Sequence, residues 1–306
     1  MGTKYTMLDF SPVSPDHIIC LKKAFASQPF RACDYTVGAV WQWRKWFDSK
    51  VAFVGPCAVL TADYPGKGAY YQFPCGGDAD DMKRALLSVE RDAEERGTEL
   101  RFCAVPAEGL KLLGEVYGER MKCSEDRDWA DYLYDIGDLK LFPGKRFHGQ
   151  KNHLNRFLKE HPFSYFVPLT EETLPQARAF LAEYDAMSPQ EKPIEREEML
   201  RSRELVEMAG ALGLKAGFLR ADADHICALS VGEVVGDTLY VHVEKADTAY
   251  AGAYQAIVSA FAQYAADTEV KWCNREDDSG EEGLRQSKQS YHPVRLIEKY
   301  WVTVDR

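Results

Sequence analysis

The chain has 306 residues, of which 45% are hydrophobic and 28% charged, and its formal net charge is −10 at pH 7. This composition is typical of a globular protein long enough for two domains, and the negative charge disfavours indiscriminate binding to nucleic acid or anionic lipid. The sequence has no apolar run of about 18 residues and opens with no basic, apolar leader, so we expect a cytoplasmic protein without a transmembrane segment.

The first half of the chain predicts alternating helices and strands. Ser14 suits the cap of the first helix, and a later helix has acids in its first turn and Gly97 just past its end. In chain order we expect a helix over residues 14–28, strands over 56–64 and 68–76, a helix over 78–97, a strand over 99–105, a helix over 107–121 and a strand over 128–136.

The second half repeats this order after two helices over residues 174–187 and 195–213. Strands over 225–235 and 237–244 are joined through Gly236 and Asp237, a pair typical of a tight hairpin turn. A helix over 249–266, a strand over 269–274, a helix over 281–290 and a strand over 294–304 follow. The shared order favours two α/β domains, residues 1–135 and 166–306, joined by a basic connector over 136–165.

The eight cysteines are scattered, at positions 20, 33, 57, 75, 103, 123, 227 and 273, with no CxxC pair. Zinc sites usually show closely spaced ligand pairs, which are absent from this sequence. Several of these cysteines lie in apolar runs that resemble strands. We therefore expect reduced, buried thiols and no metal site.

The connector contains a basic run, LKLFPGKRFHGQKNHLNRFLK, over residues 139–159. It carries six Lys or Arg residues and two His residues but no acid. In a negatively charged chain this pattern indicates an anionic ligand such as phosphate, nucleic acid or a lipid head group. A solvated basic face is the alternative interpretation. Phe142, Phe147 and Phe157 interleave with the charges, which is consistent with packing or with base stacking.

The strand over residues 237–244 carries chemically active side chains. Strict alternation predicts Leu239, Val241 and Val243 on one face and Tyr240, His242 and Glu244 on the other. A phenol, an imidazole and a carboxylate in a row are suitable for proton transfer near neutral pH. A satisfied structural network is the alternative interpretation.

The stretch WCNREDDSGEEGLRQSKQSYHP, residues 272–293, is rich in acids but does not fit a calcium loop. With Gly280 at the sixth position of an EF-hand, Arg275 and Gln286 occupy the two end positions that should be acidic ligands. The stretch is more typical of a strand end, a charged loop and a short helix. It then either lines the mouth of a cleft and presents Tyr291 and His292 towards it, or forms a charged surface turn.

Three motifs resemble a known family. They are GKRFHGQKNHLNRF (144–157), VHVEKADTAYAGAYQ (241–255) and NREDDSGEEGLRQSKQSYHPVRLIEKY (274–300). Together they resemble the C-terminal domain of phosphatidylglycerol lysyltransferases, and more closely the free-standing bacterial proteins grouped with that domain. The resemblance implies an α/β (α+β) fold of tandem GNAT-like acyltransferase domains, each a mixed sheet flanked by helices, as in Fem-type aminoacyl transferases.

The resemblance implies an acyltransferase that moves an aminoacyl group from aminoacyl-tRNA to an amine or hydroxyl acceptor, such as a small molecule or a lipid head group. Glu244 or His242 is expected to accept the acceptor's proton, and Tyr291 to protonate the leaving hydroxyl. The expected substrate-binding residues are Tyr240, Gly252, Ala253, Gln255, Asn274, Arg275, Glu276, His292, Lys145, Arg146, Lys151, Asn152, His153 and Arg156.

Two alternatives remain open on the sequence. In the first, acyl-CoA is the donor, and the turn at Gly252 holds its pyrophosphate at a helix N-terminus. In the second, the chain is a non-catalytic protein that binds an anionic partner through its basic run. In no case do we expect a permanently bound cofactor. We expect the first domain to be structural, because its helix-entering turn CGGDADD is acidic and repels phosphate.

Overall fold

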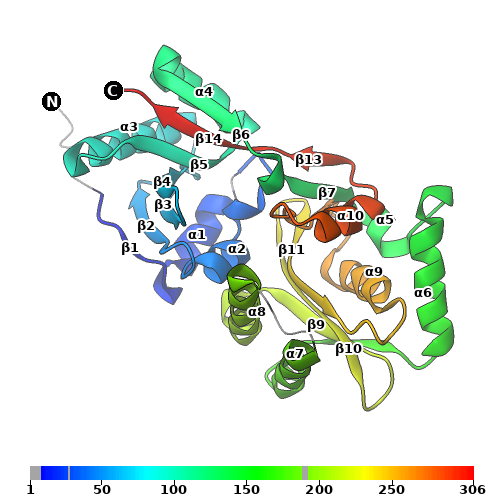
Figure 1. Ribbon diagram of the computed structural model, residues 1–306. Helices are drawn as coiled ribbons and strands as arrows, with labels where there is room; N and C mark the ends of the chain where they lie inside the picture. Colours follow the sequence, from blue (N-terminus) through cyan, green and yellow to red (C-terminus); the bar gives the residue numbers. More distant parts are fainter. Residues whose placement is uncertain (1–7, 27, 188–191) are drawn as a thin grey trace. The chain divides into compact units, whose positions relative to one another are not determined.

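The computed structural model of the chain describes residues 8–26, 28–187 and 192–306, and it divides into two compact units. The first unit extends to Asp131 and also contains Ile297–Arg306, whereas the second is Tyr132–Leu296. Within the described ranges, each unit is built on one seven-stranded mixed sheet with helices packed against it (Figure 1). This agrees with the predicted α/β class.

The sheet of the first unit contains one parallel strand pair, β4 with β5, and its other pairs are antiparallel. In spatial order its strands are β1 (Ser11–Pro12), β2 (Lys50–Val54), β3 (Cys57–Tyr64), β4 (Gly68–Gln72), β5 (Leu100–Pro106), β14 (Lys299–Val304) and β6 (Met121–Glu125). The α-helices of the unit are α1 (Ile18–Phe25), α2 (Val37–Trp43), α3 (Ala79–Arg96) and α4 (Ala107–Tyr117).

Helix α3 matches its predicted range, 78–97, to within one residue at each end. Asp78 and Asp81 form a reciprocal capping box at its start, and Gly97 ends it in the left-handed conformation. The hydroxyl of Tyr71 on β4 donates to the carboxylate of Asp92 on α3, at 2.7 Å. This buried bond ties the helix to the sheet.

The sheet of the second unit also contains one parallel pair, β11 with β12. In spatial order its strands are β13 (Arg295–Ile297), β7 (Asp131–Asp135), β12 (Trp272–Asn274), β11 (Thr238–Ala246), β10 (Ile226–Val235), β9 (Lys215–Arg220) and β8 (Tyr165–Pro168). Helices α5 (Ile136–Leu141), α6 (His148–Glu160) and α9 (Ala253–Ala265) lie on one side of β9–β11, and α7 (Leu174–Met187) and α8 (Pro193–Leu212) on the other (Figure 1). Helix α10 (Glu282–Ser290) follows β12 along the chain.

A β-bulge interrupts the central hairpin of this sheet. Strands β10 and β11 pair antiparallel, with Val231 opposite Val243, but the next pair is Gly232 with Val241. His242 is therefore an extra residue on β11, which is the defining feature of a bulge.

The bulge changes which face of the sheet each side chain meets. Gly232 permits the close approach, because an ideal Cβ there would lie 2.1 Å from the carbonyl oxygen of Tyr240. Leu239 and Val241 before the bulge and Ala246 after it all belong to the core cluster around α9. Positions 241 and 246 are five residues apart, so strict alternation would have placed them on opposite faces.

The last strand of each predicted half is exchanged between the sheets. Strand β7, expected to close the first sheet, joins the second, and β14 joins the first, where it pairs with β5 and β6. The predicted strand over 294–304 is split at Glu298 into β13 and β14, which lie in different sheets. The two units therefore differ from the predicted domains: residues 132–165 belong to the second unit and residues 297–306 to the first.

The predicted connector is a folded part of the second unit. It forms α5, a short 3₁₀ turn and α6 before it enters β8. Phe142, Phe147 and Phe157 are at most 1% exposed and belong to the core cluster around α9. Of the two interpretations of these rings, packing is confirmed, and base stacking is not available to side chains buried in this way.

The approach of α6 to α9 depends on one glycine, which gives a test of this packing. Gly252 caps α9 with a φ of +87°, and an ideal Cβ there would lie 2.2 Å from the carbonyl oxygen of His153 on α6. Gly252→Ala should lower the free energy of unfolding by about 2 kcal/mol or more, because it combines a left-handed alanine with a backbone clash. Urea denaturation followed by circular dichroism measures the change.

The matched control is Gly210→Ala in α8, where an ideal Cβ meets nothing within 4 Å. This substitution should leave stability unchanged or raise it by up to about 1 kcal/mol, because alanine favours helix interiors. Similar stability of wild type and Gly252→Ala would contradict the packing described for α6 and α9.

Candidate active site

Glu244 lies on β11 two residues before Ala246, so its side chain is on the face covered by α9. Tyr240 lies between Leu239 and Val241 of that cluster, so Tyr240 and its strand partner Glu233 are on the other face. His242 bonds to Glu233 and is therefore on that face too. The expectation that Tyr240, His242 and Glu244 form one row is wrong, because the bulge separates His242 from Glu244. The second unit therefore has two polar groups, one on each face of its sheet.

The first polar group joins residues from four segments of the second unit. The Glu244 carboxylate forms an ion pair with the guanidinium of Arg275, which follows β12, and both side chains are about nine-tenths buried. The guanidinium carbon of Arg275 lies 4.6 Å from the ring centroid of Tyr291, at the end of α10. Gln255 on α9 donates from Nε2 to the hydroxyl oxygen of Tyr291, at 3.1 Å.

Burial shifts the pKa values in this group. It raises the pKa of Glu244, and Arg275 only partly offsets this effect. Burial likewise raises the pKa of Tyr291 to about 12, so the phenol is protonated at neutral pH. Burial opposes the charge of Arg275, but Glu244 outweighs it and holds the pKa of the guanidinium above its ordinary value. Nη1 of Arg275 is buried and makes no hydrogen bond within the described part of the chain.

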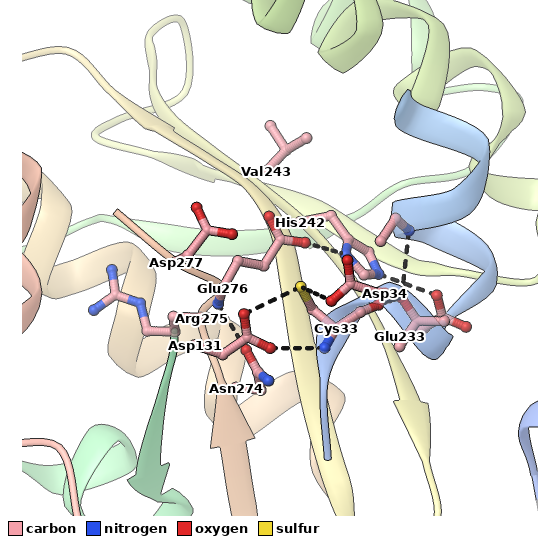
Figure 2. A network of polar contacts seen from close by, with 12 residues as sticks. Cys33, Asp34, Asp131, Glu233, His242, Val243, Asn274, Arg275, Glu276 and Asp277 are labelled. Atoms are coloured by element: carbon pink, nitrogen blue, oxygen red, sulfur yellow. Dashed lines mark hydrogen bonds and ion pairs between the residues drawn. The ribbon is translucent and has the colours of Figure 1, made fainter. Parts of the chain in front are cut away.

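The second polar group is a histidine between two carboxylates (Figure 2). His242 Nδ1 lies 2.8 Å from Glu276 and Nε2 lies 3.0 Å from Glu233 on β10. Burial lowers the pKa of the imidazole, but the hydrogen bonds to Glu233 and Glu276 outweigh it and raise the pKa to about 9. At neutral pH His242 is therefore an imidazolium that donates from both nitrogens, which disfavours a role as proton acceptor.

The loop after β12 contributes one residue to each polar group. Arg275 pairs with Glu244, and the next residue, Glu276, bonds to His242. Glu276 has a φ of +58°, a strained value for a residue other than glycine. The side-chain oxygen of Asn274 accepts from the Glu276 amide, at 2.7 Å. The ammonium of Lys288, from α10, donates to the carbonyl oxygens of Arg275 and Asp277.

The far end of the same loop is held by Asp278. Its carboxylate accepts from Tyr132, at 2.6 Å, and pairs with Arg285, at 2.8 Å. Burial opposes ionisation of Asp278, but the bonds from Arg285 and Tyr132 prevail and lower its pKa to about 2. The loop within residues 272–293 is therefore held at both ends, and it contributes side chains to both polar groups.

The turn before α9 is tightly packed. Gly252 faces the backbone of α6, as described above, and the amide of the buried Ala253 donates to the carbonyl oxygen of Tyr250, at 3.0 Å. Gly252 and Ala253 were expected to hold a pyrophosphate, but in this structure both make contacts within the unit. Gln255, one turn further, instead contacts Tyr291.

The residues of the basic run lie on the 3₁₀ turn and on α6, and most are engaged within the unit. Arg146 pairs with Asp138, Arg156 pairs with Glu160 at 2.8 Å, Lys151 donates to the carbonyl of Leu141 at 3.1 Å, and Asn152 contacts His148 at 3.3 Å. Lys145 is exposed, and His153 contacts Gly252 through its backbone carbonyl. The run is thus a largely exposed basic surface whose charges are partly neutralised.

Two further residues expected in the site, Tyr240 and His292, are packed or bonded within the second unit. Tyr240 is 1% exposed. His292 has a φ of +53° and lies 2.6 Å from the carbonyl oxygen of Arg146 through Nε2, so it joins the end of α10 to the basic run. The sequence analysis missed Glu233 and Lys288. A carboxylate inside the apolar run SVGEVV was a usable signal for Glu233, whereas no local pattern distinguishes Lys288 from a surface lysine.

Comparisons with known proteins give the chain its family. The family model described as "Phosphatidylglycerol lysyltransferase, C-terminal" matches residues 25–303. The chain is also 25% identical over 178 residues to an uncharacterized protein of Mycoplasmoides gallisepticum, and it spans about half the length of that curated relative, 56%. No helix in the described ranges is long and apolar enough to cross a membrane.

Solved structures show the same fold. A conserved protein of unknown function from Bacteroides thetaiotaomicron is similar, with a TM-score of 0.87 and 29% identity, and the match covers 98% of this chain and 100% of that one. L-PGS from Bacillus licheniformis has a TM-score of 0.68 at 14% identity, covering 95% and 92% of the two chains. FemX has a TM-score of 0.62 at 9% identity, covering 97% and 98%.

At such low identity, the likeness to L-PGS and FemX bears on the fold alone. It confirms the predicted α/β class with two sheets, each a mixed sheet flanked by helices. Because the family model spans nearly the whole chain, the chain belongs to the phosphatidylglycerol lysyltransferase C-terminal family, as its three motifs predicted.

Proposed function

We propose that the chain transfers an aminoacyl group from aminoacyl-tRNA to an amine or hydroxyl acceptor, and that Glu244, Arg275 and Tyr291 carry the chemistry. The family and fold support an acyl or aminoacyl transferase. The observation that carries the finer proposal is the buried contact of a carboxylate, a guanidinium and a phenol. This combination supplies a base, a cation and an acid within one small volume.

In the proposed reaction, Glu244 accepts the proton of the acceptor's amine or hydroxyl while that group attacks the carbonyl carbon of the aminoacyl ester. A carbon–nitrogen or carbon–oxygen bond forms, and negative charge develops on the carbonyl oxygen. The uncommitted Nη1 of Arg275 is a suitable donor to this oxygen. Collapse of the intermediate breaks the ester bond, and the tRNA hydroxyl leaves with the proton of Tyr291. Return of the proton from Glu244 to Tyr291 balances the cycle.

The pKa values support these roles. A carboxylate whose pKa is raised by burial is a stronger base than an exposed one, as the task of Glu244 requires. Tyr291, with its pKa near 12, stays protonated until the leaving oxygen takes its proton. His242 is given a positioning role, because its bond to Glu276 fixes the loop that carries Arg275.

The basic run is proposed to contact the phosphates of the tRNA. Lys145 and several other residues of the run are exposed on α6 and on the turn that precedes it. A surface of this kind binds a polyanion mainly through charge, and the binding weakens with salt. Acyl-CoA is a less suitable donor, because the packed turn at Gly252 leaves less room for a pyrophosphate.

The catalytic proposal predicts that Glu244→Gln and Tyr291→Phe each lower the rate of transfer at least ~100-fold, the usual contribution of a general base or acid. The measurement is single-turnover loss of the labelled aminoacyl group from charged tRNA in the presence of candidate amines and hydroxyl compounds. Tyr291→Phe is the sharper variant, because it removes one oxygen and keeps the ring beside Arg275.

Glu171→Gln, an exposed neutralisation in the same unit, is the control and should transfer at the wild-type rate. Melting temperatures identify variants that lose activity by unfolding, a concern for Glu244→Gln, which leaves Arg275 buried without its carboxylate. A folded Tyr291→Phe protein with wild-type transfer would remove Tyr291 from the mechanism, and the same result for Glu244→Gln would remove Glu244.

The positioning role of His242 predicts a pH dependence of stability. Its folded pKa, about 9, is above the ordinary value of 6.5, so its contribution is fully present below pH ~6.5 and is lost as the pH rises through 9. Glu233, Glu276, Asp277 and Lys288 face this region. The melting temperature of the wild type should fall between pH 7 and pH 10, and His242→Gln should flatten that fall. If the melting temperatures of the two proteins fall in parallel as the pH rises, His242 is not a stabilising imidazolium.

A further inference from the structure

The first unit contains a cavity of about 340 Å³ whose lining combines two aromatic rings with charges of both signs. It lies on one face of the sheet, over β4, β14 and β6. Its lining consists of Lys67, Tyr70, Lys122, Cys123, Ser124, Glu125, Asp126, Trp301 and Thr303. The volume is within the range of small-molecule sites. All of these residues belong to the first unit, so the inference does not depend on the proposed function.

The register of the strands explains why this face is accessible. Tyr71 contacts α3, so its neighbour Tyr70 points away from the helices. Val302 is fully buried opposite Phe102, whereas Thr303 pairs with Arg101 and points away from α4. Helices α3 and α4 therefore cover one face of the sheet (Figure 1). The side chains of Tyr70 and Thr303 place the cavity on the other face.

The aromatic rings of the cavity are held in place. The centroids of Tyr70 and Trp301 are 4.9 Å apart, with their planes at 70°. The guanidinium carbon of Arg101 lies 4.5 Å from the Tyr70 centroid, and its nitrogens donate to the carbonyls of Lys67 and Ala69 at 3.1 and 3.0 Å. Arg101 thus fixes both the ring and the turn that carries Lys67.

The ammonium of Lys67 lies over the face of the Trp301 ring, 4.4 Å from the ring centroid. The lysine side chain is long and exposed, so a planar ligand ring can take its place on the indole while the ammonium moves to the ligand's anionic group. Lys122 supplies a second cation and pairs at present with Asp305, at 2.6 Å.

The mixture of groups limits the chemistry of the ligand. A simple anion is disfavoured by Glu125 and Asp126, and a simple cation by Lys67 and Lys122. A ribonucleotide uses all of them: the base stacks on an aromatic ring, the phosphate pairs with lysine, and the ribose hydroxyls donate to carboxylates. We propose that this face of the first unit binds a ribonucleotide, either free or as an unpaired nucleotide of an RNA strand.

The test is titration of the full chain with adenosine monophosphate and with a single-stranded oligoadenylate of six nucleotides. The indole N–H signals of the six tryptophans are followed by NMR. Trp301→Phe assigns the Trp301 signal and keeps a ring in the fold. We expect that signal to move on titration, and affinity to fall at least about fivefold in Trp301→Leu, the loss expected for one stacked base. Equal affinity for both probes identifies a free nucleotide, and preference for the oligomer identifies RNA.

Lysine variants keep the test valid if Trp301→Leu fails to fold. Lys67→Ala and Lys122→Ala should weaken binding and lower its salt dependence. Lys111→Ala is the matched control, since Lys111 is exposed on α4 at the covered face of the sheet. The proposal is overturned if neither probe moves the Trp301 signal, or if Lys111→Ala weakens binding as much as the other two.

Discussion

The buried ion pair between Glu244 and Arg275 is the interaction on which the second unit's candidate site depends. Removing two charges from water is costly, and loss of one partner from such a pair typically destabilises a protein by about 3–5 kcal/mol. The chain therefore has to hold Arg275 accurately, and the bonds from Asn274, Lys288 and Asp278 to its loop do so.

The second constraint is the single extra residue in β11. Without the bulge at His242, the imidazole and Glu244 would share one face of the sheet and compete for the same partners. With the bulge, Arg275 and Glu276 each find an opposite charge, one on each side. The close approach at Gly232 shows that the backbone is adapted to this arrangement.

The sequence predicted best those features that depend on residues close to one another in the chain. The boundaries of α3 follow from its capping box and from Gly97, and β11 and its hairpin turn follow from composition. The bulge and the exchange of β7 and β14 were missed, because both depend on pairing between segments distant in sequence. Glu244, Tyr291 and Arg275 were each named from the sequence, but their contact with one another required the fold. So did the partners of His242, since Glu233 and Glu276 lie nine and 34 positions away.

The most direct test of the proposed donor is the melting temperature of the chain with saturating charged tRNA, uncharged tRNA, coenzyme A or acetyl-CoA. A ligand at about 100 times its Kd stabilises the folded state by ~2.7 kcal/mol, which is a readily measured shift. We predict that charged tRNA raises the melting temperature most and that the two coenzyme A compounds leave it unchanged. A shift with acetyl-CoA and none with charged tRNA would contradict it.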